Sequence, residues 1–286
     1  MCEEEEIHDV YAITPKLIIE SCKKHDLYTF PELNEELYLH YCGFQKIAAL
    51  EPYVNLKSLW LNNNAIGLLE GLNSLKNLVC LYLSYNVITE ISGLDELENL
   101  ETLVLSHNYI SKISGLSNLK KLHSLEIDHN QISSIADMNE LKDVKTLGVL
   151  NLGSNKIETE DFMQIISELP DLAVLKIEGN PIARTMVNYR RRIIVSTPKL
   201  AYLDQQPVDE LERKCAELYL TVGKDAAIQE RQRVLQERED FKEKNRRELK
   251  RINKEYALAN GIDISNDNYF RESGSETESN DINEID

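Results

Sequence analysis

Several features that mark large classes of protein are missing from this sequence of 286 residues. No apolar run approaches the roughly 20 residues that a membrane-spanning helix requires, and four glutamates follow Met1 and Cys2 where a secretory signal would be basic. The five cysteines are scattered and contain no C-x-x-C pair, which argues against a disulfide framework and against a zinc knuckle. We therefore expect a cytoplasmic protein without a membrane segment.

Positive charge is also scarce, because the sequence has 32 Lys and Arg residues but 49 Asp and Glu residues, which gives a net charge of −17. Such a balance repels phosphate backbones and anionic lipids, so neither nucleic acid nor membrane is expected as a partner. The sequence contains no G-x-G-x-x-G, P-loop, H-E-x-x-H or G-x-S-x-G motif. We expect no enzyme, no cofactor, no metal and no small-molecule substrate.

What the sequence has instead is an internal repeat of the form L-x-x-L-x-L-x-x-N-x-I. The second leucine of the pattern falls at positions 37, 59, 81, 103, 125, 150 and 175, so the step is 22 residues four times and then 25 twice. This pattern is typical of leucine-rich repeats, in which a short strand and a return segment must stack on their neighbours to bury their apolar side. The sequence predicts an α/β repeat solenoid, a leucine-rich repeat horseshoe with a parallel sheet on its concave face.

We divide the chain into five regions. Residues 1–32 form an acidic N-terminus and a capping helix with Thr14 and Pro15 at its start, and residues 33–187 form the repeats. Residues 188–208 form a C-terminal cap, in which three consecutive arginines from Arg190 serve capping and ion pairing rather than nucleic-acid binding. Residues 209–260 form a charged α-helix, for which a solitary solvated helix is favoured over a coiled coil. Residues 261–286 form an acidic disordered tail.

The residue between the two inward leucines of each repeat defines a column on the concave face, and the first half of this column is aromatic. Aromatic side chains on an exposed sheet are typical anchors for a protein partner. The alternative is that the N-terminal cap or the acidic tail folds over them. The candidate partner-binding residues on and beside this column are Tyr38, Trp60, Tyr82, Val104, Glu126, Tyr41, Tyr85, His107 and His129.

The repeated asparagines have a different predicted role, which is to satisfy backbone groups where the chain leaves each strand. They are Asn64, Asn86, Asn108, Asn130, Asn155 and Asn180. Two histidines, His107 and His129, occupy equivalent positions in adjacent repeats and should lie about 5 Å apart. Asp128 is expected to point to the other side of the sheet, which leaves a metal ion without a third ligand. A structural or partner-contact role is therefore favoured for the two histidines.

Two stretches of sequence carry a more specific resemblance. The run from Leu33 to Phe44, followed by Leu56 to Asn64, resembles the opening of the dynein axonemal assembly factor 1 family. The segments from Gly179 to Ile182 and from Asn188 to Arg192 resemble the same family. In total, the resemblance covers about residues 12–240.

The resemblance implies a non-catalytic protein-interaction scaffold for cytoplasmic preassembly of axonemal dynein arms, required for cilium and flagellum assembly and motility. Its partners would be axonemal dynein chains or chaperone-linked assembly factors, and it would act in the cytoplasm and the cilium or flagellum. Two alternatives stay open at this point. One is a structural axonemal subunit like the leucine-rich dynein light chain, and the other is a phosphatase-regulating leucine-rich repeat protein.

Overall fold

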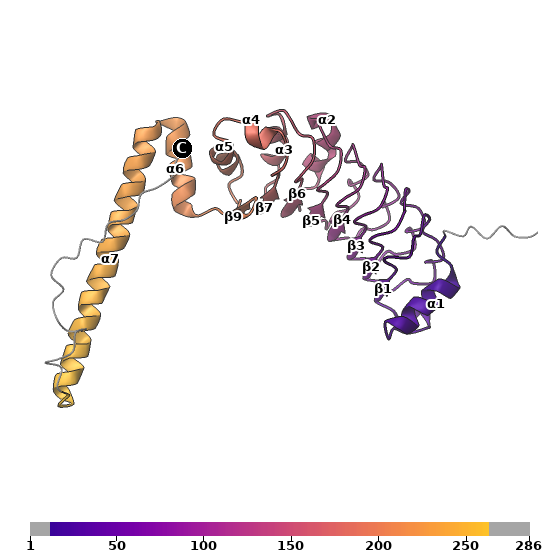
Figure 1. Cartoon of the computed structure of the whole chain (residues 1–286), viewed down its shortest axis with the longest axis horizontal. Coiled ribbons are helices and arrows are strands. Elements are labelled where there is room, and N and C mark those ends of the chain that lie inside the picture. Colours follow the sequence, from indigo (N-terminus) through magenta and orange to yellow (C-terminus); the bar gives the residue numbers. More distant parts are fainter. Residues whose placement is uncertain (1–11, 263–286) are drawn as a thin grey trace, which may run out of the picture. The chain divides into compact units, whose positions relative to one another are not determined.

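The computed structural model of the chain describes residues 12–262, which form two compact units, one ending at Val222 and one beginning at Gly223. The first unit contains one nine-stranded sheet in which strands follow each other in chain order (Figure 1). Strands β1 to β8 pair in parallel, and β9 pairs antiparallel with β8. The strands are β1 (Glu36–Tyr38), β2 (Ser58–Trp60), β3 (Cys80–Tyr82), β4 (Thr102–Val104), β5 (Ser124–Glu126), β6 (Val149–Asn151), β7 (Val174–Lys176), β8 (Tyr202–Leu203) and β9 (Gln206–Pro207).

The middle residue of each repeat strand is a leucine that points into the solenoid. Leu37 pairs in register with Leu59, which pairs with Leu81, and the same register continues to Leu203. These leucines are fully buried in one continuous apolar core. Because successive side chains alternate across a strand, the residues on both sides of each leucine lie on the concave face. The register therefore brings equivalent positions of successive repeats next to each other.

The repeated asparagines link each repeat to the one before it. In Asn86, the side-chain Nδ2 donates to the carbonyl oxygens of Leu61 and Leu83, each at 3.0 Å, and Oδ1 accepts from the backbone N–H of Ile66 at 3.0 Å. The same contacts recur at the other ladder positions, and all but Asn64 are buried. Each side chain satisfies backbone groups that would otherwise be buried without partners.

The return segments change character along the chain. The 22-residue repeats return through turns, where Gly93 has a φ of +67° and lies so close to the preceding return that a Cβ would meet the carbonyl oxygen of Leu69 at 2.0 Å. The later, longer repeats have room for short helices on the convex side (Figure 1). These are α2 (Ile135–Met138), the 3₁₀ helix η2 (Asn139–Asp143), α3 (Phe162–Ile166) and α4 (Ile182–Thr185).

The N-terminal end of the sheet is covered by helix α1 (Pro15–Lys24), which is followed by the 3₁₀ helix η1 (Pro31–Leu33). Thr14 caps α1 by accepting a hydrogen bond from the N–H of Leu17, and Pro15 is the first helical residue. Ile18 and Cys22 are fully buried on the core side of this helix. The cap therefore shields the apolar end of the first repeat from solvent.

At the C-terminal end, helix α5 (Tyr189–Ser196) packs against helix α6 (Glu210–Thr221). Arg190 pairs with Glu212 through two nitrogens at 2.5 and 2.7 Å, and it also donates to the backbone carbonyls of Leu203 and Pro207. The other two arginines are also engaged, since Arg191 lies over the ring of Tyr219 and Arg192 pairs with Glu160 at 2.6 Å. All three therefore have partners within the first unit, in α6 or in the repeats.

The region 209–260 comprises two helices, because α6 ends at Thr221 and α7 (Lys224–Ala259) begins after Gly223, whose φ is +131°. Exposed ion pairs three or four residues apart run along α7, such as those of Arg251 with Glu248 and Glu255. None of the helices within residues 12–262 has both the length and the apolar character needed to cross a bilayer. The expected acidic tail and the acidic residues before position 12 lie outside the described residues.

Candidate partner-binding face

The aromatic column of the concave face is a continuous stack of rings. The ring centroids of Tyr38 and Trp60 are 4.6 Å apart with an interplanar angle of 25°, and those of Trp60 and Tyr82 are 5.1 Å apart with an angle of 11°. This spacing matches the separation of neighbouring strands, about 4.8 Å, so the parallel register produces the stack. All three side chains are half-buried, which places them on the sheet surface and not inside the solenoid core.

The N-terminal cap places one further ring, tilted by 39°, against the end of this stack. His25 follows the last turn of α1, and its ring lies 5.0 Å from that of Tyr38. The Tyr38 hydroxyl donates to the Glu36 carboxylate at 2.6 Å, and this hydrogen bond raises the pKa of Tyr38, with smaller contributions from burial and the Glu36 charge. Burial is the main cause of a raised pKa at Tyr82. The cap therefore contacts one end of the aromatic column while Trp60 stays half-exposed.

The second half of the column is polar or aliphatic. Val104 and Glu126 are half-buried, Asn151 is buried and Lys176 is exposed. The aromatic part of this column is therefore restricted to strands β1 to β3.

A second row of side chains lies where the chain leaves each strand, one residue before each ladder asparagine. The backbone there is left-handed in every repeat, with φ of +58° at Tyr85, +57° at His107 and +54° at His129. The three rings stack, since the centroids of Tyr85 and His107 are 4.1 Å apart and those of His107 and His129 are 4.0 Å apart. Tyr41 occupies the equivalent position of the first repeat, where it is 76% exposed and contacts His40 edge-on.

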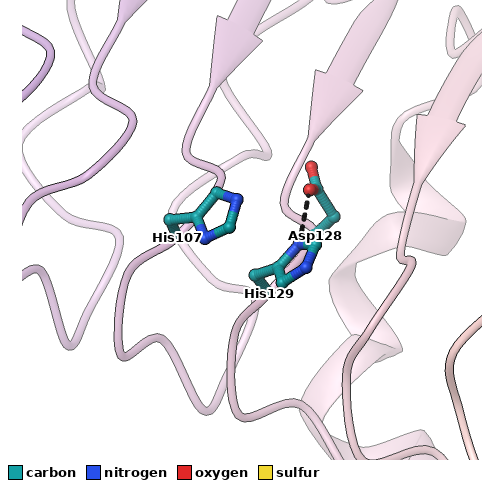
Figure 2. Close-up of side chains that lie close together, drawn as sticks. All are labelled: His107, Asp128 and His129. Atoms are coloured by element: carbon teal, nitrogen blue, oxygen red, sulfur yellow. Dashed lines mark hydrogen bonds and ion pairs between the residues drawn. The ribbon is translucent and has the colours of Figure 1, made fainter.

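The position of Asp128 corrects the expectation that its carboxylate points away from the histidines. Its Oδ2 lies 2.9 Å from Nδ1 of His129, and the two side chains face each other (Figure 2). The expectation was wrong because the strand has already ended at Glu126, so the strict alternation of a strand does not apply to Asp128 and His129. Burial and then the neighbouring His129 lower the pKa of His107, and Asp128 opposes this effect.

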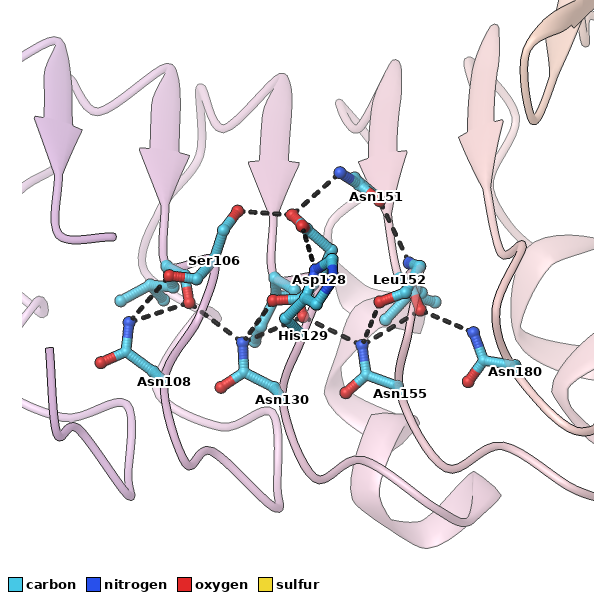
Figure 3. A network of polar contacts seen from close by, with 12 residues as sticks. Ser106, Asn108, Asp128, His129, Asn130, Asn151, Leu152, Asn155 and Asn180 are labelled. Carbon is cyan, nitrogen blue, oxygen red and sulfur yellow. Dashed lines mark hydrogen bonds and ion pairs between the residues drawn. The ribbon is translucent and has the colours of Figure 1, made fainter. Parts of the chain in front are cut away.

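Asp128 is the centre of a polar network that joins three repeats (Figure 3). Its Oδ1 accepts hydrogen bonds from the hydroxyl of Ser106 in the preceding repeat and from Nδ2 of Asn151, at 2.9 Å, in the following repeat. Asn151 is itself fixed by the backbone N–H of Gly153, which donates to its Oδ1 at 3.1 Å. The carboxylate is therefore held in place from both sides.

Two family models match the repeats. A model described as leucine-rich repeat matches residues 96–232, and a model for two copies of leucine-rich repeats matches residues 54–96. A solved leucine-rich repeat protein of Leptospira interrogans superimposes with a TM-score of 0.52 at 24% identity, covering 61% of this chain and 43% of the other. The chain belongs to the leucine-rich repeat proteins.

Curated relatives share most of the described part of this leucine-rich repeat protein. A protein of Chlamydomonas reinhardtii named leucine-rich repeat-containing protein ODA7 is 52% identical over 233 residues, which cover 82% of this chain and 54% of the relative. Human dynein axonemal assembly factor 1 is 56% identical over 211 residues, which cover 74% of this chain and 29% of the relative. The chain is therefore related to dynein axonemal assembly factor 1, and its match spans about half or less of the length of these relatives.

A second set of asparagines also repeats at an interval of 22 residues, and its role was not predicted from the sequence. Asn55, Asn77 and Asn99 lie before strands β2, β3 and β4, and each donates through Nδ2 to a carbonyl oxygen of the preceding repeat at 2.8 to 2.9 Å. Their equal spacing is visible in the sequence and would have predicted equivalent positions in successive repeats. The contact of His25 with the aromatic column had no such signal, because it depends on how α1 folds against β1.

Proposed function

We propose that this leucine-rich repeat protein is a non-catalytic protein-interaction scaffold in the assembly of axonemal dynein. Its repeats hold a protein partner on the concave face, and it acts in the cytoplasm before dynein arms enter the cilium or flagellum. The partner is an axonemal dynein chain or a chaperone-linked assembly factor. The observation that carries the proposal is the identity of 56% with human dynein axonemal assembly factor 1, which is named for this process.

The aromatic column supplies a physical reason to place the partner on this face. Tyr38, Trp60 and Tyr82 present three half-exposed rings in a fixed stack, which limits the conformational entropy lost when a partner packs against them. Rigid aromatic side chains carry a large share of the binding energy in many protein interfaces. The rings therefore act as the anchor of the proposed interface.

A pull-down of dynein chains from a cytosolic fraction tests this assignment. The variant Tyr38→Ala, Trp60→Ala, Tyr82→Ala removes the column, and we expect it to reduce recovery at least tenfold. The matched control Tyr28→Ala, Phe30→Ala, Tyr109→Ala removes three exposed rings that lie outside the strands and should leave recovery unchanged. Equal recovery with both variants would refute the assigned face.

Cell fractionation separates the proposed role from that of a stable axonemal subunit. An assembly factor is expected in the cytosolic fraction and in less than one copy per dynein. A subunit that stays in the axoneme would instead co-purify with dynein in a fixed ratio, and that result would overturn the proposed role.

A further inference from the structure

The cluster of His107, Asp128 and His129 combines three metal-ligating side chains on one surface of the solenoid (Figure 2). One ligand atom from each residue lies within 4.8 Å of the other two, and among residues 12–262 no other group of three meets this condition. His107 is half-buried and His129 is exposed, so an ion can reach the cluster from solvent. We propose that these three residues form a binding site for a divalent transition-metal ion of the zinc class.

The separation of His129 and Asp128 is close to that of two ligands of such an ion. Zn²⁺ binds histidine nitrogen and carboxylate oxygen at about 2.0–2.2 Å, which places tetrahedral ligand atoms about 3.3 Å from each other. Nδ1 of His129 and Oδ2 of Asp128 already lie 2.9 Å apart. Binding through Nδ1 replaces this hydrogen bond, and the proton of the neutral ring then resides on Nε2. The ring of His107 must rotate out of its stack with His129 to complete the set of three.

The carboxylate is held by the kind of surrounding contacts that metal ligands have. Ser106 and Asn151 donate to Oδ1 of Asp128 from the two neighbouring repeats, and Oδ2 is directed toward His129 (Figure 3). Such hydrogen bonds orient a ligand before the ion arrives and raise its affinity. The cluster is therefore fixed on its carboxylate side and adjustable on its histidine side.

The chemistry of the ligands selects the class of ion. Two imidazole nitrogens and one carboxylate favour Zn²⁺ and similar first-row dications over Ca²⁺ and Mg²⁺, which prefer oxygen ligands. Three protein ligands leave a fourth position for water or for a side chain of a molecule on the concave face. The site is independent of the proposed dynein function, because it requires only the three residues and their two supporting side chains.

Isothermal titration calorimetry of the full chain with ZnCl₂ tests the site. We expect saturable binding of one ion that is lost in the variant His107→Asn, His129→Asn and is at least tenfold weaker in Asp128→Asn. Asparagine is chosen because Asn63 occupies the equivalent left-handed position of an earlier repeat, with φ of +57°, so the backbone tolerates it. Unchanged thermal unfolding of each variant without zinc verifies that the fold is intact.

The other described histidines serve as controls for surface binding. His25 and His40, whose ring centroids are 5.9 Å apart, form a second pair, and His123 lies beside Gly148. Binding should persist in His25→Asn, His40→Asn and in His123→Asn. Zinc binding that survives the loss of His107 and His129, or that disappears with His25 and His40, would overturn the assignment.

Discussion

Trp60 lies against Tyr82 with ring centroids 5.1 Å apart and ring planes inclined by only 11°. The two residues belong to consecutive repeats and are exact partners in the parallel register of β2 and β3. The contact therefore exists because two strands that are 22 residues apart in sequence are placed side by side. Trp60 is the single tryptophan of the chain, so its fluorescence reports on its stacking with Tyr82 and with Tyr38.

The first prediction concerns that contact. The substitution Tyr82→Ala exposes one face of Trp60 to water, so we expect its emission maximum to shift to longer wavelength and the unfolding free energy to fall by about 1 kcal/mol. Tyr85→Ala, which removes an exposed ring outside the column, should leave the emission maximum in place. Identical spectra for wild type and Tyr82→Ala would contradict the stack.

The second prediction concerns the asparagine ladder. Asn86→Ala leaves the carbonyl groups of Leu61 and Leu83 and the N–H of Ile66 without their side-chain partner, which should lower the unfolding free energy by about 2–4 kcal/mol. Urea denaturation measures this change. Asn73→Ala, at an exposed position, should alter stability by about 0.5 kcal/mol or less. A similar effect of both substitutions would show that the ladder contributes no specific stability.

The third prediction concerns the tight turn at Gly93. Gly93→Ala places a methyl group against the carbonyl oxygen of Leu69 at a left-handed backbone position, so we expect a loss of about 2–4 kcal/mol. Gly67→Ala is the matched control, because the nearest atom to its Cβ lies 3.9 Å away. Thermal unfolding should therefore separate the two variants, and equal melting temperatures would refute the close approach.

The fourth prediction concerns alkaline pH. Burial raises the pKa of Tyr53 to about 12, helped by the charge of Cys22 and a hydrogen bond to it. Because the folded pKa lies above the ordinary value of about 10, this contribution to stability is complete below pH 10 and is lost as the pH rises to about 12. Phenylalanine cannot ionise, so Tyr53→Phe should lose less stability than wild type between pH 10 and 12.

Urea denaturation at several pH values measures that difference. Tyr28→Phe, whose ring is 61% exposed, should show the same alkaline profile as wild type. If Tyr53→Phe and wild type lost stability in parallel above pH 10, Tyr53 would not be the group responsible.

The repeat architecture was predictable because its cause is local and periodic. Because leucines recur every 22 or 25 residues at inward-facing positions, the copies bury all of these leucines by stacking on each other. The predicted leucine-rich repeat solenoid is confirmed. The aromatic column followed from the same periodicity, since parallel register places Tyr38 beside Trp60 and Trp60 beside Tyr82. The helix cap at Thr14 and Pro15 was likewise predictable, because it depends only on residues that are adjacent in sequence.

The orientation of Asp128 was decided only by the tertiary structure. Sequence alternation placed its carboxylate on the side away from His129, but the chain leaves strand geometry after Glu126, and Ser106 and Asn151 from two other repeats hold Oδ1. His25 reaches Tyr38 for a similar reason, because the packing of α1 against β1 sets its place. Periodic burial determines which repeats stack, whereas side chains beyond the strand ends take their direction from hydrogen bonds and packing between distant parts of the chain.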